Sequence, residues 1–555
     1  MSAEEENASK AGSARRQFLK TVIGGAAASV VVSARLDAQS TNPQSLESEA
    51  ASASAEIEEI SVQSLLDGLQ SGKFTSRQLV EKYLARIAAV DRSGPRLNSI
   101  IEINPEALAI ASALDNERKS DGARGLLHGI PVLIKDNIGT GDRMQTTAGS
   151  LALVGAQPGR DSFVASRLRA AGAIILGKTN LSEWANFRSS NSTSGWSGRG
   201  GLTRNPYALD RNPSGSSSGS GAAVSANLCA VAVGTETDGS IISPASCCGV
   251  VGIKPTVGLV SRTGIIPISR TQDTAGPMAR SVADAAALLG AMAGIDPADD
   301  ATSAAKGNIQ NDYTRYLDPK GVRGARIGVL RKAAGIGDAV DTLFQEAIAA
   351  LKNAGAEIVD PADVPTFGKF GDAEMEVLLY EFKDDLNKYL SALGSDARVH
   401  SLKEVIDFNE KHRREEMPYF GQDIFLQSEA RGPLTSEDYK KALEQCRKMS
   451  RTDGIDAVMD KMKLDALLAP TGGPACVTDL LDGDRTPGNS STLPAVAGYP
   501  HITVPMGYVF GMPVGLSFFG RAWSEPVLIK FAYAYEQQTK VRKAPRYLVE
   551  ADLAV

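Results

Sequence analysis

The segment Asn212–Thr256, NPSGSSSGSGAAVSANLCAVAVGTETDGSIISPASCCGVVGIKPT, carries the pattern that decides the fold. It opens with three consecutive serines, Ser216–Ser218, in a Gly/Ser loop. An Ala-rich helical stretch and a short apolar strand follow, and a second Gly-Ser turn ends at Ser240. Upstream, the apolar run GIPVLIKDNI (129–138) delivers Lys135 near its end. A buried lysine and two loop serines are able to perform acyl transfer without histidine.

These segments resemble the amidase signature family, serine hydrolases that cleave amide bonds with a Ser–cis-Ser–Lys triad. The family's nucleophile closes a Gly-Gly-Ser-Ile type turn, which reads Asp238-Gly239-Ser240-Ile241 here. The resemblance therefore implies Ser240 as the nucleophile and Ser216, which lies 24 residues earlier, as the bridging serine. The family's lysine closes a G-[IV]-P-x-x-[IVL]-K-D motif, which falls on Lys135. A cis peptide bond is implied before Ser216 or Ser217.

The chemistry of these residue types agrees with the implied roles. A serine hydroxyl attacks a carbonyl only when a base takes its proton. Burial disfavours the charged form of lysine and lowers its pKa, so a buried lysine can be that base. Lys135 follows Pro131-Val-Leu-Ile134, and we expect its backbone to lie in a buried strand. The resemblance implies that Ser216 relays the proton between Lys135 and Ser240.

The turn before the nucleophile is the expected oxyanion hole. The backbone N–H groups of Thr237, Asp238, Gly239 and Ser240 should point at the developing negative charge. Gly239 lets the substrate carbonyl approach closely. Asp238 departs from the glycine of most members but matches the peptide-amidase-like subgroup, and Ile242 stands where many members have arginine. Both departures alter the pocket and leave the triad intact.

Further blocks extend the resemblance from about Ile57 to Leu548, among them GKTNLSEWA (177–185) and TQDTAGPMARSVADAA (271–286). Within the family, the chain looks most similar to bacterial peptide amidases, which remove the C-terminal carboxamide of peptides. The resemblance thus implies a small amide or peptide-amide substrate, ammonia as product and no cofactor or metal. Hydrolases of aryl, lactam or fatty-acyl amides in the same family remain alternatives. So do a tRNA-dependent amidotransferase A subunit and a non-catalytic binding protein on this fold.

Two other motifs are interpreted as coincidental. Residues 172–179 fit the phosphate-loop pattern G-x4-G-K-[ST], but the intervening Ala-Ile-Ile-Leu is a strand rather than a Gly-rich loop. Residues 215–219 fit the G-x-S-x-G nucleophile elbow, but a polar loop precedes them instead of a buried strand. A Ser–His–Asp hydrolase stays as a minor alternative. Structural or solvated roles are expected for the four histidines, His128, His400, His412 and His501.

The N-terminal residues predict export. RRQFLK (15–20) is a twin-arginine motif, and the Gly/Ala-rich apolar stretch 21–34 is too short to span a bilayer. We expect residues 1–38 to be a twin-arginine signal peptide, cleaved after Ala34 or Ala38, which delivers the protein to the periplasm or medium. The alternative is a basic tail with an accidental arginine pair. The Ser/Ala/Glu-rich residues 39–56 are expected to be a disordered linker.

Apolar strand-like runs alternate with helical stretches along the rest of the chain. This alternation predicts one large α/β domain with a mixed β-sheet flanked by helices. The resemblance implies that this domain, residues 57–548, has the amidase signature fold. Residues 57–91 read as two amphipathic helices, and about 307–454 as helical cover that shapes substrate access. The runs are 130–134, 174–176, 230–233, 250–253, 327–330, 466–468, 501–505 and 514–519.

The charge of the chain argues against a nucleic-acid partner. The net charge is −6, and no basic patch favours nucleic acid. No stable membrane anchor is expected. The five cysteines have no zinc-like spacing, and Cys229, Cys247 and Cys248 are expected to be buried thiols, with a bridge between Cys446 and Cys476 left open.

Overall fold

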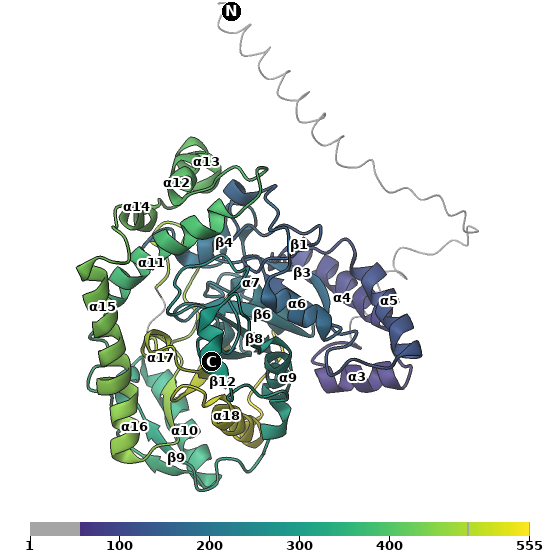
Figure 1. Ribbon diagram of the computed structural model, residues 1–555. Coiled ribbons are helices and arrows are strands. Elements are labelled where there is room, and N and C mark those ends of the chain that lie inside the picture. The colour runs from purple at the N-terminus through teal and green to yellow at the C-terminus, as the bar shows by residue number, and fades with distance from the viewer. Residues whose placement is uncertain (1–55, 486–487, 554–555) are drawn as a thin grey trace, which may run out of the picture. The chain divides into compact units, whose positions relative to one another are not determined.

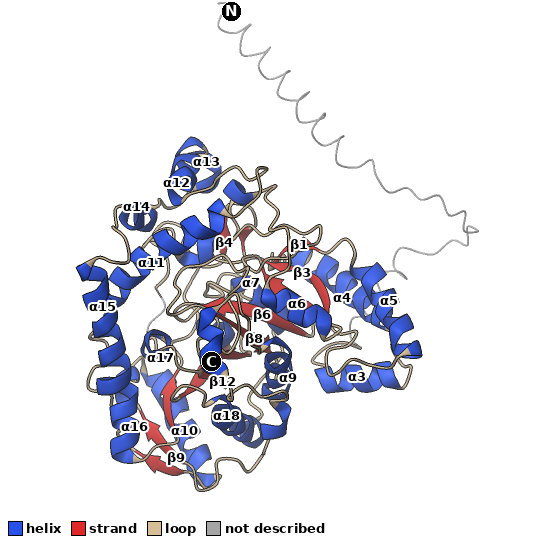
Figure 2. Ribbon diagram, viewed as in Figure 1, coloured by secondary structure: helices blue, strands red, loops and turns tan. Residues whose placement is uncertain are grey.

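Eleven strands form one mixed sheet in the described residues, 56–485 and 488–553, of a computed structural model (Figures 1 and 2). Parallel pairs join β2 to β3 and β6, and β9 to β10 and β11, while the other neighbours are antiparallel. The strands, in sheet order, are β1 (Ile100–Ile103), β3 (Ile174–Thr179), β2 (Pro131–Lys135), β6 (Val231–Glu236), β8 (Thr274–Ala279), β7 (Val251–Lys254), β12 (His501–Val509), β13 (Met512–Phe519), β11 (Ala466–Pro470), β9 (Arg326–Val329) and β10 (Glu357–Val359).

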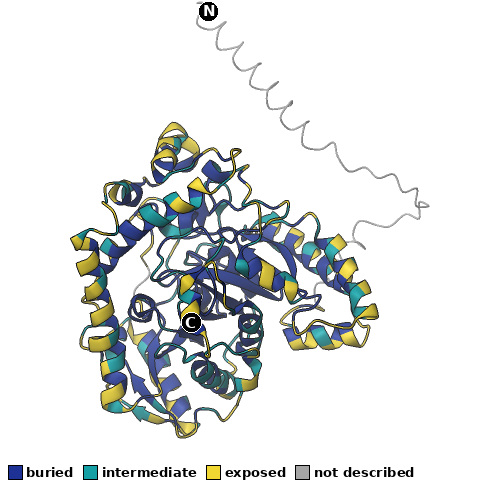
Figure 3. Ribbon diagram, in the orientation of Figure 1, coloured by how far each residue is buried: buried dark blue, intermediate teal, exposed yellow. Residues whose placement is uncertain are grey.

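Helices flank this sheet and bury it. Helices α6 (Phe163–Ala170), α9 (Val282–Met292), α18 (Glu525–Thr539) and α10 (Asp338–Asn353) pack in a row against the strands. Helices α7 (Ser218–Ser225) and α8 (Ile242–Cys247) pack on its centre, where every strand residue from β6 to β8 is buried (Figure 3). The remaining helices are α3 (Val62–Gln70), α4 (Ser76–Arg86), α5 (Ala107–Ser120), α11 (Gly371–Ser391), α12 (Leu402–Lys411), α13 (Arg413–Glu416), α14 (Asp423–Glu429), α15 (Glu437–Arg447), α16 (Asp456–Met462) and α17 (Thr492–Ala497).

The expected mixed sheet and the single α/β domain are confirmed. All eight apolar runs overlap strands, and the two N-terminal helices form as α3 and α4. Thr75 caps α4 with a capping box, in which its hydroxyl accepts from Gln78 N at 3.1 Å and its own N donates to Gln78 Oε1 at 2.9 Å. This exchange satisfies two backbone donors at the helix start.

Strand β8 was not foreseen in the sequence because it contains residues that disfavour strands. Its sequence, TAGPMA, includes Gly276 and Pro277. Pairing with β6 on one side and β7 on the other overrides that local preference. Gly276 is required there, since a Cβ at this position would lie 2.0 Å from Ile253 O.

The stretch 307–454 is more than the helical cover expected from its charge. It supplies β9 and β10, so it extends the central sheet by two strands. The run 327–330 is short, but β9 is held between β11 and β10 by parallel pairing. The helices α11, α12, α14 and α15 of the same stretch pack on one another, with exposed outer faces on α15 (Figures 1 and 3).

The coincidental phosphate-loop pattern corresponds to a buried strand of the sheet. Residues 174–179 form β3, and Lys178 is buried with its Nζ donating to Ile138 O at 2.7 Å and Thr146 Oγ1 at 2.9 Å.

His501 is buried, its Nε2 lies 2.6 Å from Ser517 Oγ, and burial lowers its pKa to about 3. Cys446 is a buried free thiol, so the bridge left open to Cys476 does not form.

Two sequence-based expectations cannot be compared with the described residues. The predicted signal peptide, 1–38, and the linker, 39–56 except Glu56, lie outside them. Within them, no helix is long and apolar enough to cross a membrane. Nor does the described part of the chain hold a group of three His, Cys, Asp or Glu side chains that could bind a metal ion.

The tight packing around β8 yields a stability prediction. We expect Gly276→Ala to destabilise the fold by about 1–3 kcal/mol, the usual penalty for overpacking a core. Thermal unfolding followed by circular dichroism measures the change. Gly394→Ala is the matched control, because a Cβ at residue 394 meets no atom within 4 Å. Equal melting temperatures for both variants would contradict the close approach of β8 to Ile253.

Candidate active site

Lys135 ends β2, a strand enclosed between β3 and β6, and its side chain is fully buried. Its Nζ donates to Ser216 Oγ at 2.8 Å, to Thr235 Oγ1 at 2.9 Å and to Thr235 O at 3.2 Å. Burial lowers the pKa of this amine to about 7, although the nearby Asp273 and Glu236 carboxylates act in the opposite direction. The lysine is therefore able to accept and return a proton near neutral pH.

The serine loop holds Ser216 against this amine. The peptide bond between Gly215 and Ser216 is cis, which confirms the expected position of that bond. Ser182 N donates to Ser216 O at 3.1 Å. A Cβ on Gly215 would lie 2.2 Å from Ser182 Oγ, so only glycine fits in this loop. Ser216 is fully buried and faces Lys135 from the end that precedes α7.

The nucleophile turn is tied to the same loop. Ser217 N donates to Ser240 O at 3.0 Å, and Ser217 Oγ donates to Thr235 O at 3.0 Å. Glu236 closes the turn from the other side, since its Oε2 accepts from Ile241 N at 2.7 Å and Ile242 N at 3.0 Å. Ser240 is thereby fixed between β6 and α8 with 8% of its surface exposed.

Backbone donors are available beside Ser240. Among the described residues, the N–H groups of Asp238, Gly239 and Ser240 have no hydrogen-bond acceptor. Gly239 and Ser240 are buried, and an unpaired buried N–H is costly unless a ligand satisfies it. Gly239 has a φ of 77°, in the left-handed region that favours glycine. The geometry is that of an anion-binding turn.

Side chains brace the turn at both sides. Thr237 Oγ1 donates to Asp273 Oδ1 at 2.6 Å. The Asp238 carboxylate accepts from Thr492 Oγ1 at 2.6 Å and from the Ser491 hydroxyl. Ser491 belongs to the run Asn489-Ser490-Ser491, which precedes α17.

Two cavities adjoin the turn. One, of about 350 Å³, reaches Asn137, Thr235 and Thr237 and has an apolar wall that includes Ile265, Ile266, Ile268 and Tyr389. The other, of about 320 Å³, is reached by Asp238 and is lined by Asn186, Phe187, Ser189, Ser190, Ser192, Gly371, Glu374, Met375, Leu378, Ile424 and Asp484. One cavity therefore reaches the turn at Thr237 and the other at Asp238.

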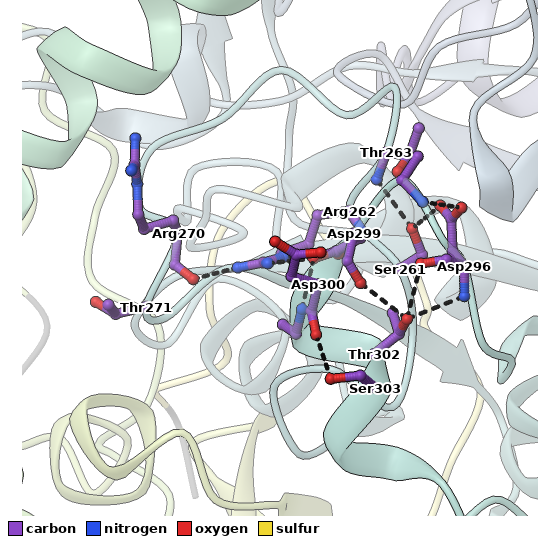
Figure 4. A network of polar contacts seen from close by, with 12 residues as sticks. Ser261, Arg262, Thr263, Arg270, Thr271, Asp296, Asp299, Asp300, Thr302 and Ser303 are labelled. Atoms are coloured by element: carbon purple, nitrogen blue, oxygen red, sulfur yellow. Dashed lines mark hydrogen bonds and ion pairs between the residues drawn. The ribbon is translucent and has the colours of Figure 1, made fainter.

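One wall of the larger cavity is held by a polar network (Figure 4). Arg262 N and Nε donate to Asp299 Oδ2 at 2.8 and 2.9 Å. Thr302 Oγ1 in turn donates to Asp299 O at 2.8 Å. Arg262 also donates to the backbone carbonyl of Arg270, so the wall is continuous with the loop that carries Asp273 (Figure 4).

Several functional residues were missed in the sequence because their contacts are distant along the chain. Thr235, Asn137 and Asp273 lie around Lys135, and although each falls inside a quoted sequence block, the sequence analysis gave none of them a role. Asn137 Nδ2 donates to Thr235 Oγ1 at 2.9 Å, which orients the hydroxyl that meets Lys135. Burial raises the pKa of Asp273 to about 6. Glu236 and Thr235 lie in the quoted GTETDGSI turn, and that position was the available signal.

Comparison with known proteins agrees with this site. The family model described as Amidase matches residues 78–529. A probable amidase of Arabidopsis thaliana is 43% identical over 501 residues, covering 89% of this chain and 92% of the relative. Native peptide amidase from Stenotrophomonas maltophilia has 51% identity and a TM-score of 0.84 over 88% of this chain and 99% of that one. A peptide amidase structure with the competitive inhibitor chymostatin has 52% identity and a TM-score of 0.86 over 88% and 100%.

The buried lysine predicts a pH dependence. Because its pKa is lowered to about 7, the basic form is lost below pH 7 and fully present above about pH 8. We expect labelling of Ser240 by a serine-directed fluorophosphonate to rise through a midpoint near pH 7. Rates from pH 5 to 9 on folded protein measure it, with Ser240→Ala as the unlabelled control. A flat profile would exclude Lys135 as the base.

Proposed function

The chain belongs to the amidase family and is an amide-hydrolysing enzyme, and we propose that it hydrolyses the C-terminal carboxamide of peptides. The likeness to peptide amidases over 88% of the chain supports this substrate class. The observation that carries the reaction is the 2.8 Å contact between Lys135 Nζ and Ser216 Oγ next to the unpaired N–H groups of the turn.

In this mechanism Ser240 Oγ attacks the amide carbonyl carbon. Ser216 takes the proton from Ser240 and passes its own to neutral Lys135. The N–H groups of the turn stabilise the tetrahedral oxyanion. Lys135 then returns the proton through Ser216 to the amide nitrogen, the carbon–nitrogen bond breaks and ammonia leaves. Water attacks the acyl-enzyme by the same proton route, which frees the peptide acid and restores Ser240.

An aryl amide is the second candidate substrate. The wall of the larger cavity carries Ile265, Ile266, Ile268 and Tyr389, and aromatic groups pack well against such surfaces. Hydrolases of lactam and fatty-acyl amides would differ from an aryl-amide hydrolase only in the shape of the pocket. A non-catalytic role on the same fold would leave the close Lys135–Ser216 contact without a purpose.

The substrate class is tested by ammonia release from a C-terminally amidated dipeptide, an aryl amide and a long-chain acyl amide. We expect release from the peptide amide by the wild type and none by Ser240→Ala. Removal of an activated nucleophile costs several orders of magnitude in rate, so the variant should show background only. Turnover of the other amides alone would move the substrate, and no turnover by folded wild type would favour a binding protein.

We further propose that the protein is exported by the twin-arginine route to the periplasm or medium. Arg15 and Arg16 in front of a short Gly/Ala-rich apolar stretch support this proposal. Replacement of both by lysine should leave the full-length precursor in the cytoplasm of a bacterial host. Cell fractionation and mass determination of the N-terminus measure the outcome, with Lys10→Arg as the control. Processing of the double variant as in the wild type would contradict the proposal.

A further inference from the structure

Helix α11 is clamped to the loop that supports the nucleophile turn. Glu374, Glu381 and Asp385 lie on one face of α11, because spacings of seven and four residues return to the same side of a helix. Glu381 Oε2 accepts from Thr271 N at 3.2 Å, and Asp385 Oδ2 accepts from Arg270 N at 3.1 Å. These carboxylates hold the loop that leads to β8.

Glu374, the first of the three, reaches the turn itself. It is 7% exposed, and its Oε1 accepts from Gln272 Nε2 at 3.0 Å. The same Gln272 Nε2 donates to Thr237 O at 3.4 Å. Glu374 and Asp238 line the same cavity, and each carboxyl group influences the pKa of the other. A single side chain of α11 therefore acts on two consecutive residues of the turn, one of them through Gln272.

Two neighbouring buried carboxyl groups are stable when one of them carries a proton. Burial raises the pKa of Glu374 well above its usual range, and the neighbouring Asp238 charge raises it further. Asp238 accepts hydroxyl hydrogen bonds from Ser491 and Thr492, which favour its ionised form. Glu374 is consequently the protonated group and Asp238 the ionised one. Lys254 on β7 and Glu236 on β6 face Asp238, and Cys446 on α15 faces Glu374.

We propose that Glu374 is a positioning residue that holds the oxyanion turn from outside the sheet, through a hydrogen bond to Asp238 and through Gln272. It touches neither Ser240 nor Lys135. Its role is to fix where the N–H groups of Asp238, Gly239 and Ser240 point. The inference rests on the proposed function only in that the turn stabilises an anion, and it does not depend on which amide is cleaved.

Two substitutions of equal size separate hydrogen bonding from packing. Glu374→Gln keeps the volume, a donor for Asp238 and an acceptor for Gln272. Glu374→Met keeps the volume and loses both hydrogen bonds. A role in packing alone affects the two variants equally, whereas a positioning role is rescued by glutamine. Glu376 on the same helix gives the matched control pair, because it pairs with Arg431 at 2.8 Å and does not contact the turn.

The readout is the second-order rate of Ser240 labelling by a fluorophosphonate, whose transition state places negative charge in the same N–H turn. We expect Glu374→Gln to label near the wild-type rate and Glu374→Met at least about tenfold more slowly, a fraction of the effect of losing one oxyanion donor. Both Glu376 variants should label as the wild type does. Thermal unfolding of each variant shows that the labelling temperature lies in the folded range.

Equal labelling rates for Glu374→Gln and Glu374→Met would overturn the proposal. If Glu374→Met fails to fold, Gln272→Met serves as the second variant, since it removes the bridge to Thr237 and leaves Glu374 in place. A wild-type rate in that variant would also overturn it. A wild type that is labelled but releases no ammonia from peptide amides contradicts the proposed function alone, because the labelling comparison remains informative.

Discussion

The proposed reaction depends on the burial of one amine, that of Lys135. Lys135 lies at the end of a central parallel strand, and its carbon chain and Nζ are shielded from solvent. Desolvation lowers the pKa of the amine to about 7 against the attraction of Asp273 and Glu236. A surface lysine would remain charged at neutral pH and unable to accept a proton. The mixed sheet, with β3 and β6 on either side of β2, therefore provides the buried environment that the proposed base requires.

Strand β6 connects the parts of the site. Thr235, near its end, accepts from Lys135, and its carbonyl also accepts from Ser217. The next residue, Glu236, accepts the first N–H groups of α8 and so fixes the turn that carries Ser240. A displacement of β6 would consequently move the proposed base, the bridging loop and the proposed nucleophile together. This shared support keeps three groups in register although they lie far apart along the chain.

The three residues of the proposed triad could be located in the sequence because each belongs to a local motif with a steric signature. A glycine precedes both Ser216 and Ser240, and an apolar run precedes Lys135, so spacing along the sequence located them. Contacts between distant segments left no such signature. Gln272 and Glu374 meet across 102 residues, and β8 forms despite Gly276 and Pro277 because two neighbours pair with it. Such features depend on tertiary packing, which overrides local preference.

The negative charge of Asp238 explains why the Glu374 carboxyl group of α11 is protonated beside the turn. A carboxylate beside an oxyanion hole opposes the negative charge that forms there. Two unit charges 4 Å apart interact by about 4 kcal/mol at an effective dielectric constant near 20. The hydroxyls of Ser491 and Thr492 donate hydrogen bonds to the Asp238 carboxylate and so stabilise its charge. The proton on Glu374 limits the pair of carboxyl groups to one negative charge. The aspartate in place of the family's glycine is thus compatible with catalysis because a charged, motif-poor region supplies its partner.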